Sequence, residues 1–315
     1  MSNNSLDFDR IKGGLYGLLL GDAVGRCYEF TPPSRLPDFD LIDMVPPVGF
    51  RPTYAYVPVG TWTDDGAQAL ALLDSLLEHK GLVLDDFAEK LCQWFDNKKY
   101  TPDGVVFDCG IQTSAALNAI KQGVPMLEAA GKDEYSNGNG ALMRVLPLVL
   151  WHQGDDETLV RLAMQQGLPT HGHPRSAVVC ALYCLIAKRL LEQGVTPDVD
   201  DVQQPLRVYL SDGELKELDS ILTAPQRINP KGSGYVVDTF WSALVALDQD
   251  NFKDVIRSAI IFGNDTDTTA CVAGGLAGIY FGYDQLPKDW LDHLQGKDIV
   301  ENLLAKLALQ LSSKS

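Results

Sequence analysis

Apolar residues recur at helical spacing along most of the chain. In 64–79, for example, Ala67, Leu70, Leu73 and Leu77 fall on one stripe, and a similar stripe runs through 175–193. Repeats of three and four residues are typical of amphipathic helices, whereas a half-buried strand alternates at every second residue. The pattern predicts helices at about 9–24, 64–79, 84–97, 111–122, 140–152, 156–167, 175–193, 212–223, 235–248, 252–262, 268–282 and 289–312.

Signals for strands are few. The weakly alternating stretch 54–57 is flanked by Pro52 and Pro58, and helices do not alternate regularly with strands. This pattern argues against a doubly wound α/β fold. Without a linker or an internal repeat, the sequence predicts one all-α domain over residues 1–315.

A proline-rich segment of the chain, 31–60, carries no helical pattern. Loops of this length inside a compact domain are usually functional. We therefore interpret 31–60 as a cover for an active site.

The net charge of the chain limits the classes of molecule that it is expected to bind. The 315 residues include 42 acidic and 26 basic side chains, which gives a net charge of −16, and lysines and arginines do not cluster. An extended nucleic-acid track requires such clusters, so no nucleic-acid partner is expected. A small ligand that contains phosphate stays compatible with this charge, because a local pocket or a metal can override the global field.

The remaining composition favours a reduced, cytoplasmic protein. Six cysteines form no CxxC pair and no zinc pattern. The polar, acidic N-terminus does not resemble a signal peptide, and no apolar stretch is long enough to predict a membrane span. We expect a cytoplasmic monomer that has no contact with a membrane.

Two acidic clusters carry the candidate chemistry: Thr63-Asp64-Asp65 and Asp265-Thr266-Asp267-Thr268. Each precedes or opens a predicted helix, and either one alone is explained by helix capping. Together they hold more carboxylates than caps use, and crowded carboxylates repel unless a cation neutralises them. Carboxylate and hydroxyl oxygens suit Mg²⁺, Mn²⁺ or Ca²⁺ better than zinc. Four carboxylates around one point would suit two metals about 3.5–4 Å apart.

The second cluster also permits a competing interpretation. Residues 265–269 spell DxDxT, which resembles the nucleophile loop of haloacid-dehalogenase phosphatases. That loop follows a buried strand and opens a Rossmann-like domain. Only 46 residues follow Thr269, too few for such a domain, and the alternating strands are missing.

The order of short motifs resembles that of the ADP-ribosylglycohydrolase family over nearly the whole chain. The matching elements, none of them specific alone, are Gly21-Asp22-Ala23-Val24-Gly25 with Glu29, Trp62-Thr63-Asp64-Asp65, Phe107-Asp108-Cys109-Gly110, the loop from Ser136 to Arg144, Thr170-His171, Ser233-Gly234-Tyr235-Val236 and Gly263-Asn264-Asp265-Thr266-Asp267-Thr268.

This resemblance implies a compact, orthogonal all-α domain with a central cleft that holds two Mg²⁺ or Mn²⁺ ions. Two residues depart from the pattern: Gly66 stands where Thr or Ser is common, and Asn264 where Gly is common. Neither is a usual ligand. The metal ligands carried over by position are Thr63, Asp64, Asp65, Asp265, Asp267 and Thr268.

The resemblance also suggests catalytic residues. Glu29 would point into the cleft, although a surface glutamate at a helix end is an equal alternative. Asp108 is a candidate general acid or base, or else a cap for the helix from Ile111.

Further residues are expected to bind substrate. The loop with Ser136, Gly138, Asn139 and Gly140 precedes a helix predicted near Ala141, where free amides could cradle a diphosphate. His171 is expected to contact ribose or phosphate, unless it caps the helix from Arg175. Aromatic candidates for stacking on adenine are Tyr235 and Tyr283, although core packing is commoner. Arg144 is assigned a structural role.

The expected activity is metal-dependent hydrolysis that removes ADP-ribose from a modified protein, with free ADP-ribose as the product. Arginine is the expected acceptor, and the bond broken is then an N-glycosidic bond. Alternatives are an O-linked acceptor such as serine or poly-ADP-ribose, a small ADP-ribosyl compound, or a non-catalytic immunity or structural homologue. The presence of all six implied ligands favours an enzyme.

Overall fold

A computed structural model describes residues 7–313 of the chain. These residues form α-helices, five short 3-10 turns and only two isolated β-bridges, so the predicted all-α fold is confirmed. The helices are α1 Phe8–Gly25, α2 Asp64–His79, α3 Leu84–Asn97, α4 Ile111–Lys121, α5 Met126–Ala129, α6 Pro147–Trp151, α7 Asp156–Gln165, α8 Pro174–Gln193, α9 Val199–Arg207, α10 Asp212–Leu222, α11 Val236–Ala246, α12 Phe252–Ile260, α13 Thr266–Phe281, α14 Lys288–His293 and α15 Lys297–Ser312.

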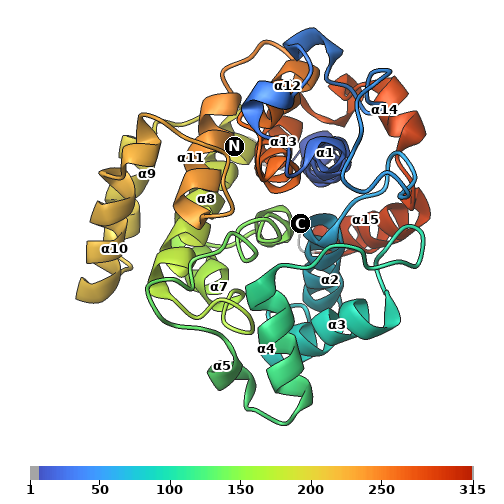
Figure 1. The fold of residues 1–315 in the computed structure, drawn as a ribbon. Helices are drawn as coiled ribbons and strands as arrows, with labels where there is room; N and C mark the ends of the chain where they lie inside the picture. The colour runs from blue at the N-terminus through green and yellow to red at the C-terminus, as the bar shows by residue number, and fades with distance from the viewer. Residues whose placement is uncertain (1–6, 314–315) are drawn as a thin grey trace.

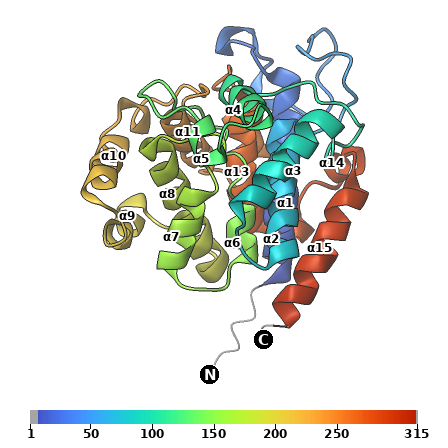
Figure 2. The same cartoon turned by 90° about the horizontal axis from the view of Figure 1, so that it is seen from below.

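Helices α1 and α13 form the centre of the arrangement (Figure 1). Around them lie α8 and α11 on one side and α2 and α15 on the other, while α9 and α10 stand at the outer edge in both views (Figures 1 and 2). None of the helices in the described part of the chain has the length and apolar character needed to cross a membrane. Between residues 7 and 264 no strand precedes Asp265, which excludes the phosphatase interpretation of the DxDxT motif.

Glycines bring α1 and α13 into backbone contact. Gly13, Gly17, Gly21 and Gly25 repeat every fourth residue on one face of α1. A Cβ atom on Gly17 would lie 2.2 Å from the carbonyl oxygen of Gly274, and the other three glycines are equally close to the α13 backbone. The two helices run antiparallel, so the end of α1 lies beside the start of α13. This packing brings Asp22 and Glu29 toward the second acidic cluster.

The helix predicted at 140–152 is wrong over its first half. Residues 140–145 form turns, and α6 begins only at Pro147. The carbonyl of Asn139 accepts from the amides of both Leu142 and Met143, and the carbonyl of Ala141 accepts from the side chain of Gln166. Tertiary hydrogen bonds therefore replace the helical ones. The apolar residues of this segment are buried as predicted, but in an irregular backbone.

Other differences lie at helix boundaries. The segment predicted as one helix at 289–312 is two helices, α14 and α15, because Gly296 has a left-handed φ of 65° between them. Helices α5 and α9 were not predicted. Helix α5 has only four residues, and α9 contains Pro205, which disfavours a helical prediction.

Candidate active site

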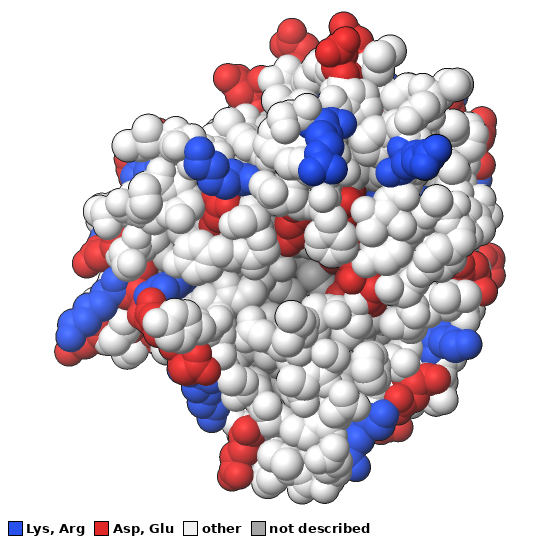
Figure 3. Space-filling view, viewed as in Figure 1, with Lys and Arg blue, Asp and Glu red and all other residues white. Residues whose placement is uncertain are grey.

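A cavity of about 960 Å³ opens in the face shown in Figure 3, where acidic side chains surround a central hollow. This volume lies at the upper end of the range for small-molecule sites. The cavity is lined by the region after α1, by the N-termini of α2, α4 and α13, and by the loops at 108–110, 134–143 and 234–235. His171 and Arg175 complete the lining. The expected central cleft is therefore present. Its acidic lining residues are Glu29, Asp64, Asp65, Asp108, Glu134, Asp265 and Asp267.

The first acidic cluster sits at the N-terminus of α2. The hydroxyl oxygen of Thr63 accepts from the amide of Asp65 at 3.2 Å, so the capping interpretation is correct for this residue. Asp64 and Asp65 line the cavity although both are buried. One oxygen of Asp65, Oδ2, has no hydrogen-bond partner. A buried carboxylate oxygen without a partner is costly unless a proton or a cation satisfies it.

The second cluster opens α13 on the facing side. Asp265 is the N-cap residue, but its side chain caps nothing; its Oδ2 accepts from Asn139 at 2.8 Å. The Oδ1 atom of Asp267 is buried and has no partner. The hydroxyl of Thr268 donates to Asp65 Oδ1 at 3.4 Å, which links the two clusters directly. The structure thus brings both predicted clusters into one cavity.

Glu29 is buried in the cavity and is not a surface residue. A side-chain hydrogen bond joins Glu29 to Asp108, and Oε2 of Glu29 has no hydrogen-bond partner. Oxygen atoms of Glu29, Asp108 and Asp267 all lie within 4.8 Å of one another, close enough to share one metal ion. The two residues expected to act in catalysis therefore also belong to the group that could hold a cation.

The segment 31–60 supports Glu29 from behind and does not cover the cavity, contrary to expectation. None of its residues is among the described lining residues. The hydroxyl of Thr53 donates to the carbonyl of Glu29 at 2.9 Å, and the ring of Tyr54 packs on Phe107 at 5.1 Å. A side-chain hydrogen bond also joins Tyr54 to Asp108. The segment thus holds the backbone of Glu29 and the side chain of Asp108.

Burial and mutual repulsion control the protonation of these carboxyls. Burial, with the nearby charges of Asp108, Asp265 and Asp64, raises the pKa of Glu29 to about 10. Burial is also the main cause that raises the pKa values of Asp64, Asp65 and Asp267 well above the usual range for aspartate. Clusters of carboxyls with raised pKa values are common at functional sites.

Arg144 is fully buried and anchors Asp64 through an intermediate glutamine. Its Nη1 donates to Gln68 Oε1 at 2.7 Å, and Gln68 Nε2 donates to Asp64 Oδ2 at 3.2 Å. Its other nitrogens donate to Gln166 and to the hydroxyl of Thr170. The predicted structural role of Arg144 agrees with this network, which holds one wall of the cavity in place.

The glycine loop after Ser136 lines the cavity but does not present a helix N-terminus, because no helix begins near Ala141. The amide of Gly138 donates to Gln112 Oε1 at 2.7 Å, and the amide of Asn139 donates to the carbonyl of Gly234 at 3.1 Å. These two amides are therefore not free for a phosphate. Asn139 instead orients Asp265, because its Nδ2 donates to that carboxylate and to Thr239.

The remaining predicted residues fall inside and outside the cavity. His171 lines it and packs against Gly140; burial lowers the pKa of this histidine to about 3, so the ring is neutral. The cap of α8 is His173 and not His171. Tyr235 also lines the cavity. Ser136 does not, and its hydroxyl donates to Asp133.

Tyr283 lies away from the cavity, against α1. Its ring packs on Tyr16 at 5.0 Å, and the ammonium of Lys12 lies 4.1 Å from the ring centroid. The alternative of core packing is therefore correct for Tyr283, and this residue is not a platform for adenine.

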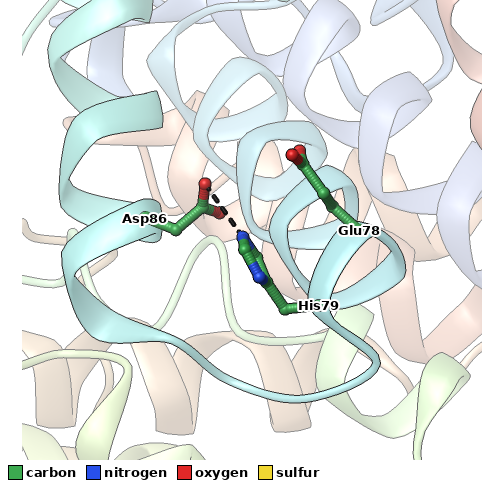
Figure 4. Close-up of side chains that lie close together, drawn as sticks. All are labelled: Glu78, His79 and Asp86. Carbon is green, nitrogen blue, oxygen red and sulfur yellow. Dashed lines mark ion pairs between the residues drawn. The ribbon is translucent and has the colours of Figure 1, made fainter.

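A second group of possible metal ligands lies outside the cavity, where Glu78 and His79 at the end of α2 face Asp86 of α3 (Figure 4). His79 lies 3.2 Å from Asp86, and the ammonium of Lys90 lies 2.7 Å from Glu78 and 3.3 Å from Asp86. Because Lys90 already neutralises these carboxylates, we interpret the group as an ion-pair network.

Asp22 is an important residue whose role the sequence did not reveal. Its buried carboxylate accepts from the amides of Thr63 and Gly66, at 3.0 and 2.8 Å, and so holds the first turn of α2 against α1. Burial raises its pKa to about 7. The glycine repeat of α1, whose member Gly21 directly precedes Asp22, was the available signal, because such a repeat indicates a close helix contact.

Comparisons with known proteins identify relatives of this chain. A model of the ADP-ribosylglycohydrolase family matches residues 3–315. The ADP-ribosylarginine hydrolase Tri1 of Serratia proteamaculans is 32% identical, over 96% of this chain and 80% of that protein. The ADP-ribosyl-[dinitrogen reductase] glycohydrolase of Rhodospirillum rubrum is 27% identical, over 92% of this chain and 91% of that protein.

A further relative and a solved structure extend the match. The human ADP-ribosylhydrolase ARH3 is 28% identical, over 95% of this chain and 92% of that protein. A solved structure described as an ADP-ribosylglycohydrolase-related protein complex superposes with a TM-score of 0.73 at 29% identity, covering 95% of this chain and 97% of that one.

The fold, the acidic cavity and these matches define a glycosyl hydrolase with an all-α fold. The chain belongs to the ADP-ribosylglycohydrolase family.

Proposed function

We propose that this enzyme removes ADP-ribose from arginine side chains of modified proteins by hydrolysing the N-glycosidic bond. The main support for this proposal is that both acidic motifs and the Glu29–Asp108 pair lie in one cavity, which is large enough for a nucleotide. The choice of arginine is supported by two relatives named ADP-ribosylarginine hydrolase, at 32% and 29% identity. An O-linked acceptor is the second candidate.

The cavity suits divalent cations. Buried carboxylate oxygens without partners on Glu29, Asp65 and Asp267 are the donors that hard cations prefer. We propose that two Mg²⁺ or Mn²⁺ ions are held there by Thr63, Asp64, Asp65, Asp265, Asp267 and Thr268, with Asp267 close to the Glu29–Asp108 pair. When bound, the ions would orient the ribose hydroxyls and lower the pKa of a water molecule.

Residues of the chain would transfer the proton and position the substrate. A substituted guanidinium already carries the proton with which it leaves as a neutral guanidine, so the proton to be moved is the one that the attacking water loses when its oxygen bonds to the ribose carbon. Glu29 and Asp108 lie side by side in the cavity, and we assign this pair to proton transfer. Gly138, Gly140, His171 and Tyr235 would shape the walls around ADP-ribose. All six cysteines are free, which supports a reducing compartment such as the cytoplasm.

The proposed linkage is tested with two peptides that carry ADP-ribose on arginine or on serine. We expect Mg²⁺-dependent release of ADP-ribose from the arginine peptide, and release from the serine peptide that is at least about tenfold slower, a difference of about 1.4 kcal/mol in activation free energy. Faster release from serine would establish the second candidate. No release from either peptide would contradict the proposed activity.

Metal binding is expected to stabilise the protein more at high pH than at low pH. The buried carboxyls hold protons in the folded state up to about pH 7 for Asp22 and about pH 10 for Glu29, whereas the unfolded chain releases them near pH 4. Stability without metal therefore decreases as pH rises through this range. Cations bind the deprotonated carboxylates, so the stabilisation that they provide increases as the pH rises.

The measurement is the melting temperature with EDTA and with Mg²⁺, at about pH 5.5 and about pH 8. We expect Mg²⁺ to raise the melting temperature by several degrees more at the higher pH than at the lower pH. An equal increase at both values would argue against binding by these carboxyls.

A further inference from the structure

The walls of the cavity contain very little positive charge. Among the described lining residues, Arg175 is the only lysine or arginine, against seven acidic side chains. Cations held by the two acidic clusters would neutralise the carboxylates at the floor of the cavity. A diphosphate adds further negative charge, and protein sites usually bind such groups with arginine or with free amides. The amides of Gly138 and Asn139 are already used within the protein.

Arg175 is held at the wall by partners on two sides. It lies in the first turn of α8, and its Nε donates to Glu217 of α10 at 2.7 Å. Its Nη1 donates to Glu134 at 2.6 Å and to the hydroxyl of Tyr235 at 3.3 Å. The Arg175 side chain is only 13% exposed, so the guanidinium has a fixed position beside the cavity. Glu217 therefore orients the group while leaving its outer nitrogens to other partners.

Glu134 differs from Glu217 in exposure. Its side chain is 63% exposed, whereas that of Glu217 is 20% exposed. Glu134 belongs to the loop before Gly138, where its backbone carbonyl accepts from Asn137 Nδ2 at 2.9 Å, and the second oxygen of its carboxylate lies 3.7 Å from His173 Nε2. An exposed ion pair contributes little stability, so a diphosphate with more charge can replace this carboxylate.

We propose that Arg175 binds the diphosphate of ADP-ribose, and that Glu134 competes with that diphosphate for the same guanidinium. This inference rests on the proposed function, because that function supplies the ligand. Glu134 thus acts as an internal anion that sets how tightly ADP-ribose and its conjugates bind.

The test is equilibrium binding of ADP-ribose, and of adenosine as a ligand without phosphate, to the full chain in Mg²⁺. Arg175→Gln is expected to weaken binding of ADP-ribose about ten- to hundredfold. Glu134→Gln is expected to tighten it about two- to fivefold. Binding of adenosine should change in neither variant. Arg161→Gln, on the exposed side of α7, is the matched control and should bind as the unmodified chain does.

A double variant separates competition from an indirect effect. If Glu134 acts through Arg175, then Glu134→Gln should have no effect on binding when Arg175→Gln is also present. Equal binding of ADP-ribose by Arg175→Gln and the unmodified chain would overturn the subsite while leaving the proposed function intact. Weaker binding by Glu134→Gln would overturn the competition, and this exposed substitution tests it even if Arg175→Gln does not fold. Failure of the unmodified chain to bind ADP-ribose would remove both proposals.

Discussion

Replacing Asp267 by asparagine is expected to lower the rate of ADP-ribose release about 1,000-fold, equivalent to about 4 kcal/mol of lost transition-state stabilisation. Asp267 lies at the junction of the proposed cation site and the Glu29–Asp108 pair. Its Oδ1 has no partner within the protein, so the charge has no structural role that asparagine would disturb. Loss of the negative charge removes a cation ligand at the point closest to the proton-transfer pair.

The same substitution is expected to stabilise the protein in EDTA. Burial, and the nearby carboxyls of Glu29, Asp265 and Asp65, raise the pKa of Asp267 well above its usual range, which shows that its charged form is unfavourable in the fold. A neutral amide removes this cost, so the melting temperature without metal should increase by a few degrees. Asp292→Asn, at an exposed position of α14, is the control and should change neither quantity. Unchanged turnover by Asp267→Asn would contradict its assignment as a ligand.

Replacing Gly17 by alanine is expected to reduce the free energy of unfolding by about 3 kcal/mol or more. The added Cβ would lie 2.2 Å from the carbonyl oxygen of Gly274 and 2.9 Å from the Cα of Gly278. Both contacts are with backbone, so no side chain can turn away to relieve them. Helices α1 and α13 would have to separate, and the two acidic clusters would move with them.

Chemical denaturation measures this effect, and Gly213→Ala provides the matched control. Gly213 also lies within a helix, α10, but a Cβ there would meet nothing within 4 Å. Alanine at Gly213 should therefore raise the free energy of unfolding by about 0.5–1 kcal/mol, because it favours the helix and restricts the unfolded chain. If the two substitutions change stability equally, the close packing of α1 on α13 is not required.

Helical periodicity in the sequence was sufficient to predict the fold class and most helices, because their apolar stripes are long and regular. It failed at 140–145, where side chains of Gln166 and Cys271 take hydrogen bonds that a helix would have used. Those partners lie far away in the sequence, and no local pattern reveals them. For the same reason the break at Gly296 was missed, since one glycine within an apolar pattern does not specify a left-handed turn.

The acidic clusters could be predicted because each is a contiguous motif, and the structure brings both to one cavity. Residues that act through distant contacts could not be predicted. Asp22 holds the first turn of α2 through two backbone amides, and Gln68 joins Arg144 to Asp64. Two of the loop amides expected to bind phosphate, those of Gly138 and Asn139, donate instead to Gln112 and Gly234. Which hydrogen-bond partner each of these groups finds depends on tertiary packing, and the local sequence does not reveal it.

The most direct test of the proposed function removes the metal and restores it. The protein is treated with EDTA, returned to buffer, and titrated with Mg²⁺ while release of ADP-ribose from an ADP-ribosyl-arginine peptide is followed. We predict no release above background in the stripped protein, and a rate that increases with Mg²⁺ and then saturates. Release by the stripped protein at the full rate would contradict a cation centre built from the two acidic clusters.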